Sequence, residues 1–347
     1  LIRVAPLDDI LKLDKDLSIE EKAKKLRVKY ILTHSFLIKD NGFDLWCKLE
    51  NIENGIALFS NKISEPMDMA TQMVGKLAND IVTSLKVKTK QDVMKAPTTN
   101  AEAYEYYLKA KDLQSTASTS KDIDKAIELC YNAIELDNNF ISAYQWLGWT
   151  YYKRGDYVNA YKYYTHYKEL AIKWESFIDV AWSYLYLGDV IYWKDYDKQE
   201  TKRLYNEALK IFRIHNHSFG ISTIYYNLAY LAWKEDFNFD KANDYYNKTI
   251  ELDKKIGLEK GDIYAQSAIL NLIMGNINKA KINIDTSIHY HKKYNENSEY
   301  KKALTIFGKI LFYNHEYEES IKKFNESLEI FQKYYNNTDT VQLELIT

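Results

Sequence analysis

The chain has 347 residues, which corresponds to roughly two domains at about 150 residues each. Its 47 Lys and Arg residues against 49 Asp and Glu leave a net charge of −2, which argues against a nucleic-acid-binding surface, because neutralising phosphates requires a concentrated basic excess. No window approaches about 18 consecutive apolar residues, so we expect no membrane span and no membrane contact by this segment. The unusual feature of the composition is its 31 Tyr and 7 Trp beside only 3 Pro.

Residues 1–90 carry signals for both strands and helices. Ser18 and Glu21 have capping-box spacing, which predicts a helix that runs to about Leu26. A second helix is expected to start at Ser64-Glu65-Pro66 and to end at about Lys86. The predicted order over this region is strand, helix, three-stranded meander, helix.

The meander is predicted from alternation and turn chemistry. A strand over 30–38 is followed by Asn41-Gly42, and Asn-Gly supplies the positive φ angles of a tight hairpin turn. The second strand is indicated by apolar residues at every other position: Phe43, Leu45, Cys47 and Leu49. Asn54-Gly55 is a second turn of the same kind and leads into a strand over 56–63.

These residues resemble a known domain. The run from Ala23 to Leu32, the hairpins at Gly42 and Gly55, and the helix start at Asp68…Gln72 are similar to the amino-terminal domain of the TolB translocation protein. The version in question is found between signalling domains and helical repeats in bacterial cyclases, kinases and membrane-tethered regulators. The resemblance covers about residues 2–88, and it implies a partial α+β domain over 1–90, because the family's additional opening strand and helix are missing.

A boundary is predicted at 90–100, and residues 98–347 contain no proline, which permits long and closely spaced helices. From residue 101 onward the chain repeats with a period of about 40 residues. A small residue recurs in the first helix of each expected pair: Ala110, Gly148, Gly188, Ala229, Ala268 and Gly308. A second small residue opens the second helix of each pair: Ala126, Ala160, Thr201, Ala242, Ala280 and Ser320. An aromatic or large apolar residue follows four positions later from the second pair onward: Tyr164, Tyr205, Tyr246, Ile284 and Phe324.

This pattern resembles tetratricopeptide repeats, with units longer than the usual repeat of about 34 residues. The best unit reads Tyr144-x-x-Leu147-Gly148-x-x-Tyr151, followed by Ala160 and Tyr164. We count six repeats over 101–335, with 336–347 as a tail or a truncated helix. The fold class expected is therefore a small α+β N-terminal domain followed by an all-α right-handed solenoid.

The resemblance implies that the first helix of each pair lines a concave groove, and it assigns aromatic residues to that groove. They are Trp149, Tyr152, Trp182, Tyr192, Trp193, Tyr226, Tyr230 and Trp233. Rigid amphipathic rings bury a large area at little entropic cost, so they are suited to binding a protein or peptide. The alternative is that these rings simply pack the repeats together. A carboxylate clamp is not indicated, because only Lys153, Lys302 and Lys309 lie near groove positions.

Other chemistry is not indicated by the sequence. His215 and His217, like His289 and His291, are two residues apart, and this spacing points the rings of a helical pair away from each other. Cys47 and Cys130 are expected to be buried apolar residues. No glycine-rich phosphate loop and no nucleophile motif is present, so we expect no catalysis, no metal and no cofactor.

The leading hypothesis is a non-catalytic, protein- or peptide-binding scaffold or sensory region. Because the chain starts at Leu1 with neither an initiator Met nor a signal peptide, we expect it to be a piece of a larger signalling protein with an upstream cyclase, kinase or DNA-binding domain. No tether or disulfide is visible, so we expect a cytoplasmic location, or an extracytoplasmic one where a missing upstream segment tethers the chain. The alternative hypothesis is a solenoid that senses a small molecule or forms a homodimer. Changing Trp149 and Trp233 to Ala is expected to abolish partner capture and to leave helicity intact.

Overall fold

A computed structural model describes residues 17–26, 28–39, 42–54, 56–66, 73, 76–77, 80–81, 83–85, 98–116, 119–294 and 296–335. The chain divides into two compact units, Leu1–Leu204 and Tyr205–Thr347, and the division falls inside helix α9 (Lys198–Ile214). Each unit is described by itself.

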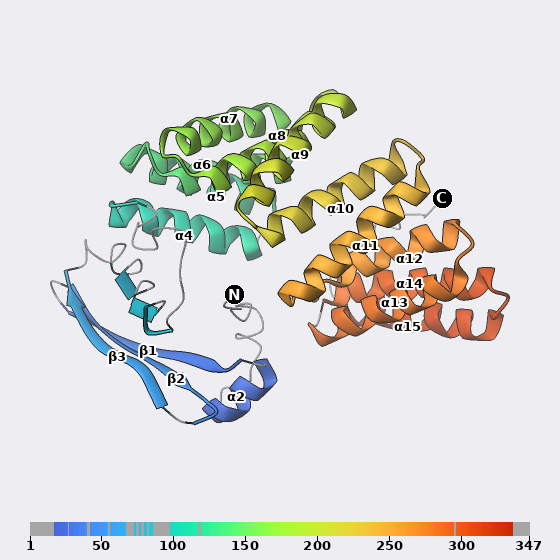
Figure 1. The fold of residues 1–347 in the computed structure, drawn as a ribbon, viewed down its shortest axis with the longest axis horizontal. Coiled ribbons are helices and arrows are strands. Elements are labelled where there is room, and N and C mark those ends of the chain that lie inside the picture. Colours follow the sequence, from blue (N-terminus) through green and yellow to red (C-terminus); the bar gives the residue numbers. More distant parts are fainter. Residues whose placement is uncertain are drawn as a thin grey trace. The chain divides into compact units, whose positions relative to one another are not determined.

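The first unit begins with a short helix and a sheet (Figure 1). Helix α2 (Ile19–Leu26) is capped as predicted: the Ser18 amide donates to Glu21 Oε2 at 2.8 Å, and the Glu21 amide donates to Ser18 Oγ at 3.1 Å. Strands β1 (Tyr30–Lys39), β2 (Gly42–Asn51) and β3 (Ile56–Glu65) form an antiparallel sheet in the order β1-β2-β3. The predicted meander is therefore confirmed.

The core of the sheet lies on one face of β2. Phe43, Leu45, Cys47 and Leu49 are all buried, which confirms the predicted alternation. On the opposite face, Asp44 accepts a hydrogen bond from Ser64 Oγ at 2.7 Å and pairs with Lys39 at 2.6 Å.

The predicted start of the next helix is wrong, because β3 extends through Glu65 and places Ser64 in a strand. Of the helix expected to run to Lys86, the described residues Met73, Lys76–Leu77, Asp80–Ile81 and Thr83–Ser84 are helical. The expected first strand, the turn residues Asn41 and Gly55, and residues 90–97 of the expected boundary lie outside the described residues.

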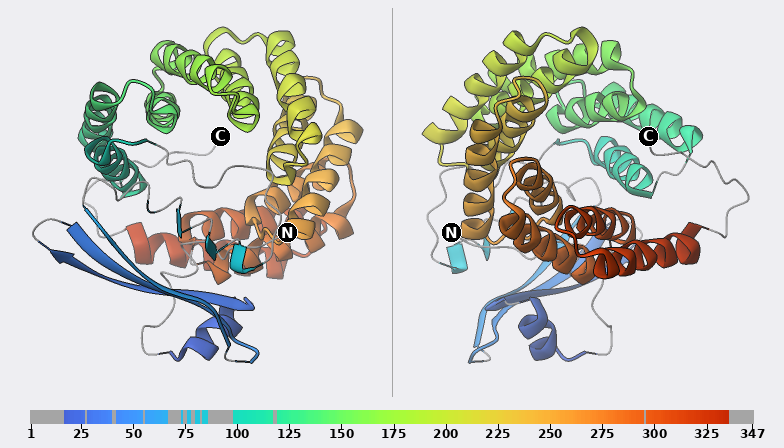
Figure 2. Two further views of the ribbon diagram at one scale, coloured as in Figure 1. Left: turned by 60° about the vertical axis from the view of Figure 1, so that its left-hand side comes forward. Right: turned by 90° about the vertical axis from the view of Figure 1, so that its right-hand side faces the viewer.

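The rest of the first unit is helical. Its helices are α4 (Ala101–Thr116), α5 (Ser120–Leu136), α6 (Ile141–Arg154), α7 (Tyr157–Lys173), α8 (Phe177–Asp195) and the start of α9. Helices α4 and α5, and helices α6 and α7, pack as hairpins, and α8 packs against α7 (Figure 2).

The described residues of the second unit form helices joined by short turns. After the end of α9 come α10 (Ser218–Lys234), α11 (Phe239–Ile256), α12 (Gly261–Ile273), α13 (Ile277–Lys293), α14 (Asn297–Tyr313) and α15 (Tyr317–Tyr335). The closest packing is within the pairs α10–α11, α12–α13 and α14–α15 (Figure 2). Together, the sheet and the helix pairs confirm the predicted fold class of a small strand-containing part followed by an all-α repeat array.

The small residues at fixed positions are required by close packing. A Cβ added at Gly148 would lie 2.7 Å from the Tyr164 ring, so α6 and α7 can approach this closely only because a glycine is there. The small residues that open the second helices are also buried: Ala126, Ala160, Thr201, Ala242, Ala280 and Ser320. The sequence interpretation of this repeat is therefore correct at the level of packing.

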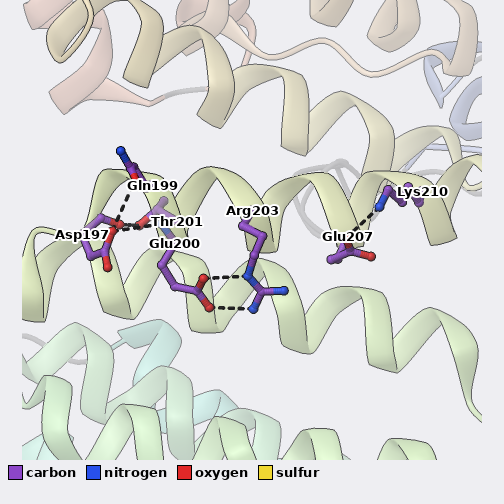
Figure 3. Close-up of polar contacts among 7 residues, drawn as sticks. All are labelled: Asp197, Gln199, Glu200, Thr201, Arg203, Glu207 and Lys210. Carbon is purple, nitrogen blue, oxygen red and sulfur yellow. Dashed lines mark hydrogen bonds and ion pairs between the residues drawn. The ribbon is translucent and has the colours of Figure 1, made fainter.

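The start of α9 shows how a polar residue can replace alanine at such a position (Figure 3). Asp197 caps the helix by accepting hydrogen bonds from the amides of Gln199 and Glu200 at 3.1 and 3.0 Å. The buried Thr201 hydroxyl is 2.7 Å from the Asp197 carbonyl and 3.3 Å from the Gly188 carbonyl of α8. The hydroxyl therefore keeps a hydrogen-bond acceptor although it is buried. Further along α9, Arg203 forms a bidentate ion pair with Glu200.

Turns within the helix pairs use left-handed backbone conformations. Gly155 and Gly275 have φ values of 82° and 75°, as the predicted turns require. Tyr196, Phe237 and His315 occupy corresponding positions with φ values of 54°, 52° and 61°. These three residues lack the freedom of glycine, so the packing of the flanking helices must hold them in this conformation.

Candidate functional site

The first part of the candidate site lies on one face of α6. Trp149 and Tyr152 are three residues apart, so they share a helix face, and their rings stack with centroids 5.8 Å apart and an interplanar angle of 17°. Lys153 Nζ lies 5.1 Å from the centre of the Trp149 ring. Both rings remain half-buried, and Lys153 forms no ion pair with a carboxylate in the described part of the chain. This face therefore offers aromatic surface next to an exposed ammonium group.

The second part lies on α8 and is joined to α6 by a hydrogen bond. Gln145 Nε2 donates to the Tyr186 hydroxyl at 3.1 Å. Trp182 stacks on Tyr186 with centroids 5.8 Å apart, and Tyr186 stacks in turn on the buried Tyr164 of α7 at 4.9 Å. Burial raises the pKa of Tyr186 to about 12, so its hydroxyl stays protonated at neutral pH. The half-buried Trp182 is thus the outer ring of a stack anchored in the core.

The end of α8 separates two residues that the sequence assigned to the groove together. Trp193 is 52% exposed, whereas Tyr192 is 6% exposed. The Tyr192 ring packs edge-on against Trp193 at 5.1 Å and lies 5.6 Å from Tyr196. The assignment of Tyr192 to the groove is therefore corrected: its ring belongs to the core.

The aromatic residues of α10 in the second unit are divided in the same way. Tyr226 and Tyr230 are half-buried, and Tyr226 packs against Tyr246 with centroids 5.9 Å apart. Trp233 is 5% exposed and belongs to a core cluster with Ile263 and Leu270 of α12. The groove assignment of Trp233 is also corrected, because its indole fills space between α10 and α12.

Two aromatic residues next to the site were not assigned to it from the sequence. Tyr186 follows Trp182 by four residues, and this spacing could have identified it as part of the same helix face. Trp146 packs edge-on against Tyr107 of α4 at 6.5 Å, with Lys111 Nζ 5.5 Å from its ring. The contact between Trp146 and Tyr107 joins two repeats. Predicting it from the sequence would require knowing which helices are neighbours.

His217, His291 and the two cysteines have structural roles. His217 caps α10, with Nδ1 accepting from the Gly220 amide at 3.0 Å. His291 is buried, with Nδ1 2.6 Å from Glu296 Oε2. Both cysteines are buried, as predicted, and burial raises the pKa of the Cys130 thiol to about 12. Within the described ranges, no three metal-ligating side chains gather into a group that could hold an ion.

Two of the lysines considered for a carboxylate clamp have local contacts within their own units. Lys302 pairs with Glu299 on its own helix at 2.7 Å, while Lys153 lies over Trp149 in the other unit. In the part of the chain that the structure describes, no helix combines the length and the apolar character needed to cross a membrane.

Comparisons with known proteins support the fold. No protein-family model matches the chain, and neither does any curated protein. Among solved structures, BtubC from P. vanneervenii is 14% identical with a TM-score of 0.51, and the match covers 71% of this chain and 96% of that one. A Signal Transduction ATPase with Numerous Domains from Pyrococcus horikoshii, which has a tetratricopeptide repeat sensor, is 16% identical with a TM-score of 0.56. That match covers 77% of this chain and 40% of the ATPase.

These likenesses place the helical part among tetratricopeptide-type repeat folds. The helix pairs, the small residues at their crossings and the similarity to a structure with a tetratricopeptide repeat sensor all agree on this class. The resemblance of residues 2–88 to the TolB amino-terminal domain remains a prediction, since no family model matches.

Proposed function

We propose that the chain is a non-catalytic scaffold that binds a protein or peptide segment on the aromatic face of α6 and α8. This α6–α8 surface is defined by six residues: Gln145, Trp149, Tyr152, Lys153, Trp182 and Tyr186. The observation that carries the proposal is the stacked Trp149–Tyr152 pair, which packs on the core yet stays only partly buried, whereas the neighbouring Leu147 and Tyr151 are buried. Large rings left partly exposed on one face are typical of interaction sites.

The chemistry of this surface suits a peptide. The rings supply apolar contact area, and because Trp182 is stacked on an anchored tyrosine, little rotamer entropy remains to be lost on binding. Lys153 Nζ over the Trp149 ring and the Gln145 amide beside Tyr186 add hydrogen-bond donors that suit the carbonyl oxygens of a peptide.

A regulatory role is the finer part of the proposal. The matched ATPase from Pyrococcus horikoshii is described as having a tetratricopeptide repeat sensor, and this chain spans 40% of its length. By analogy, occupancy of the α6–α8 surface would signal to a catalytic or DNA-binding domain of a larger protein. Repeat arrays suit this role because each pair contacts only its neighbours, so a bound peptide can change the curvature.

The test selects peptides from a random dodecapeptide library on the immobilised wild-type chain and then measures their capture by variants. Trp149→Ala with Trp182→Ala should reduce binding about 30-fold or more, because each ring contributes on the order of 1–2 kcal/mol. The matched control is Trp174→Ala, since Trp174 is 45% exposed but lies at the end of α7. Equal capture by wild type and the double variant, with both folded by circular dichroism, would overturn the proposal.

A further inference from the structure

The rings of the α6–α8 surface are held in place by their own packing. Trp149 and Tyr152 stack at an interplanar angle of 17°, and Trp182 and Tyr186 stack at 20°. All four side chains pack against the core of the first unit, and the Gln145–Tyr186 hydrogen bond joins α6 to α8. Two fixed ring pairs favour a ligand that is itself rigid and extended, because neither partner then loses much conformational entropy on binding.

Hydrogen-bond donors without partners flank these rings. Trp149 Nε1 and Lys153 Nζ have no hydrogen-bond acceptor and no carboxylate partner among the described residues. Trp149 Nε1 reaches solvent, whereas Trp146 Nε1 is buried. The six residues of the surface include no carboxylate, and one of their two phenol oxygens already accepts from Gln145. The surface is therefore richer in donors than in acceptors.

This balance favours a proline-rich segment over other forms of peptide. Proline has no backbone N–H, and a polyproline II segment makes no internal hydrogen bonds, so its carbonyl oxygens are free to accept. A helical peptide uses its carbonyls internally and would leave Trp149 Nε1 and Lys153 Nζ covered and unpaired. An extended peptide of other residues would bring backbone N–H groups to a surface that has few acceptors for them.

We propose that the α6–α8 surface binds a proline-rich segment in the polyproline II conformation. This inference rests on the proposed function, because it names the ligand class of the same surface. Proline rings lie against Trp149 and Trp182, and carbonyl oxygens of the segment accept from Trp149 Nε1 and Lys153 Nζ. Aromatic-lined grooves recognise such segments because the polyproline II helix is formed before binding and little entropy is lost.

The first experiment compares three fluorescein-labelled decapeptides by anisotropy: deca-proline, an alternating Gly-Ser peptide and an alternating Glu-Ser peptide. Deca-proline should bind the wild-type chain at least about tenfold more tightly than the other two, because it is pre-ordered and brings no backbone N–H to the surface. The Glu-Ser peptide tests whether the Lys153 charge alone selects the ligand. Deca-proline that binds no better than either of the other two would overturn the inference.

The second experiment removes the two donors one at a time. Trp149→Phe keeps an aromatic ring without the N–H, and Lys153→Met keeps most of the side chain without the ammonium group. Each should weaken deca-proline binding about threefold to tenfold, which corresponds to one hydrogen bond. The matched controls are Trp174→Phe and Lys173→Met at the end of α7, where the same pairing of a lysine with a tryptophan ring occurs outside the surface. Donor variants that bind like the wild type, or controls that weaken binding equally, would overturn the inference.

The random dodecapeptide library separates this inference from the proposed function. Peptides selected on the wild-type chain should be enriched in proline over the unselected library, and Trp149→Ala with Trp182→Ala should abolish their enrichment. Selected peptides that require Trp149 and Trp182 but are not enriched in proline would overturn this inference and leave the proposed function standing. Selected peptides that bind the double variant as well as the wild type would overturn both.

Discussion

Helices α7 and α13 occupy the same place in their helix pairs, yet their interiors are built differently. Seven residues after the small residue that opens each helix, α7 has the buried Tyr167 and α13 has the buried Ser287. Four residues further along, α7 has the buried Ala171 and α13 has the buried His291. The repeat therefore fixes where a side chain points, while the space there can be filled by an aromatic ring or by small and titratable groups.

The two interiors also satisfy their polar atoms differently. The Tyr167 hydroxyl donates to Asp179 Oδ1 at 2.7 Å, so its ring is packed and its polar end is paired. In the second unit, Ser287 Oγ and Asn271 Oδ1 are buried without a hydrogen-bond partner. An unsatisfied buried polar atom costs stability, so we expect the aromatic interior to contribute more to stability than the polar one.

The largest expected effect comes from truncating the two buried residues of this comparison, Tyr167 and Ser287. Tyr167→Ala should lower the free energy of unfolding by about 3–5 kcal/mol, because it removes a fully buried ring and leaves a cavity. Ser287→Ala should be neutral or stabilising by up to about 1 kcal/mol, because it removes an unsatisfied hydroxyl. Urea unfolding of both variants measures the difference, and equal losses would show that the two interiors are equivalent.

The next effect compares an interior pair with the terminal one. A Cβ added at Gly148 would lie 2.7 Å from Tyr164, and one added at Gly308 would lie 2.7 Å from Phe324. Tyr164 is locked in the core, so Gly148→Ala should cost about 1–3 kcal/mol. Phe324 is 37% exposed and can move aside, so Gly308→Ala should cost less than about 1 kcal/mol. Thermal unfolding of the two variants should preserve this order.

A smaller effect measures the contribution of the Tyr167 hydroxyl alone. Tyr167→Phe keeps the ring and removes only the hydrogen bond to Asp179, so it should cost about 1 kcal/mol. If Tyr167→Phe cost as much as Tyr167→Ala, packing would not be the main contribution of this residue. Chemical denaturation of the three proteins in parallel provides the measurement.

The smallest effect concerns a buried carboxyl group in the second unit. Burial raises the pKa of Asp253, although the Ser222 hydroxyl and Lys260 act in the opposite direction. Between the ordinary pKa of an aspartate, about 3.9, and the raised value, the folded chain binds more protons than the unfolded chain, so stability falls as pH rises. Asp253→Asn should therefore stabilise the chain at pH 7 by less than about 1 kcal/mol, with the gain disappearing in acid.

Much of the fold was predictable because packing restricts certain positions to small residues. Gly148, Ala160 and the other small residues identify the helix crossings, and Phe43 to Leu49 identify the central strand by alternation. The left-handed turns at Tyr196 and Phe237 were not predictable, since nothing in their local sequence favours that conformation. They are imposed by the helices on either side.

The candidate site was predictable only in part. Tyr152 and Trp233 hold the same repeat position, but Trp233 is covered by side chains of α12 that are about thirty residues away in sequence. The expectation that Trp233→Ala leaves helicity intact is therefore replaced: loss of this buried ring should destabilise the second unit by about 3–5 kcal/mol. Trp149 is half-buried and packs against the core of the first unit, so its truncation should cost less than that of Trp233.

The measurement that tests the central claim most directly is fluorine NMR of the chain labelled with fluorotryptophan, with its 7 Trp resonances assigned by single Trp→Phe variants. The titrant is a dodecapeptide selected on the wild-type chain. The account predicts that the Trp149 and Trp182 resonances shift with the peptide while the buried Trp233 resonance stays in place. A peptide that shifts Trp233 or Trp174 and leaves Trp149 and Trp182 unchanged would contradict binding at the α6–α8 surface.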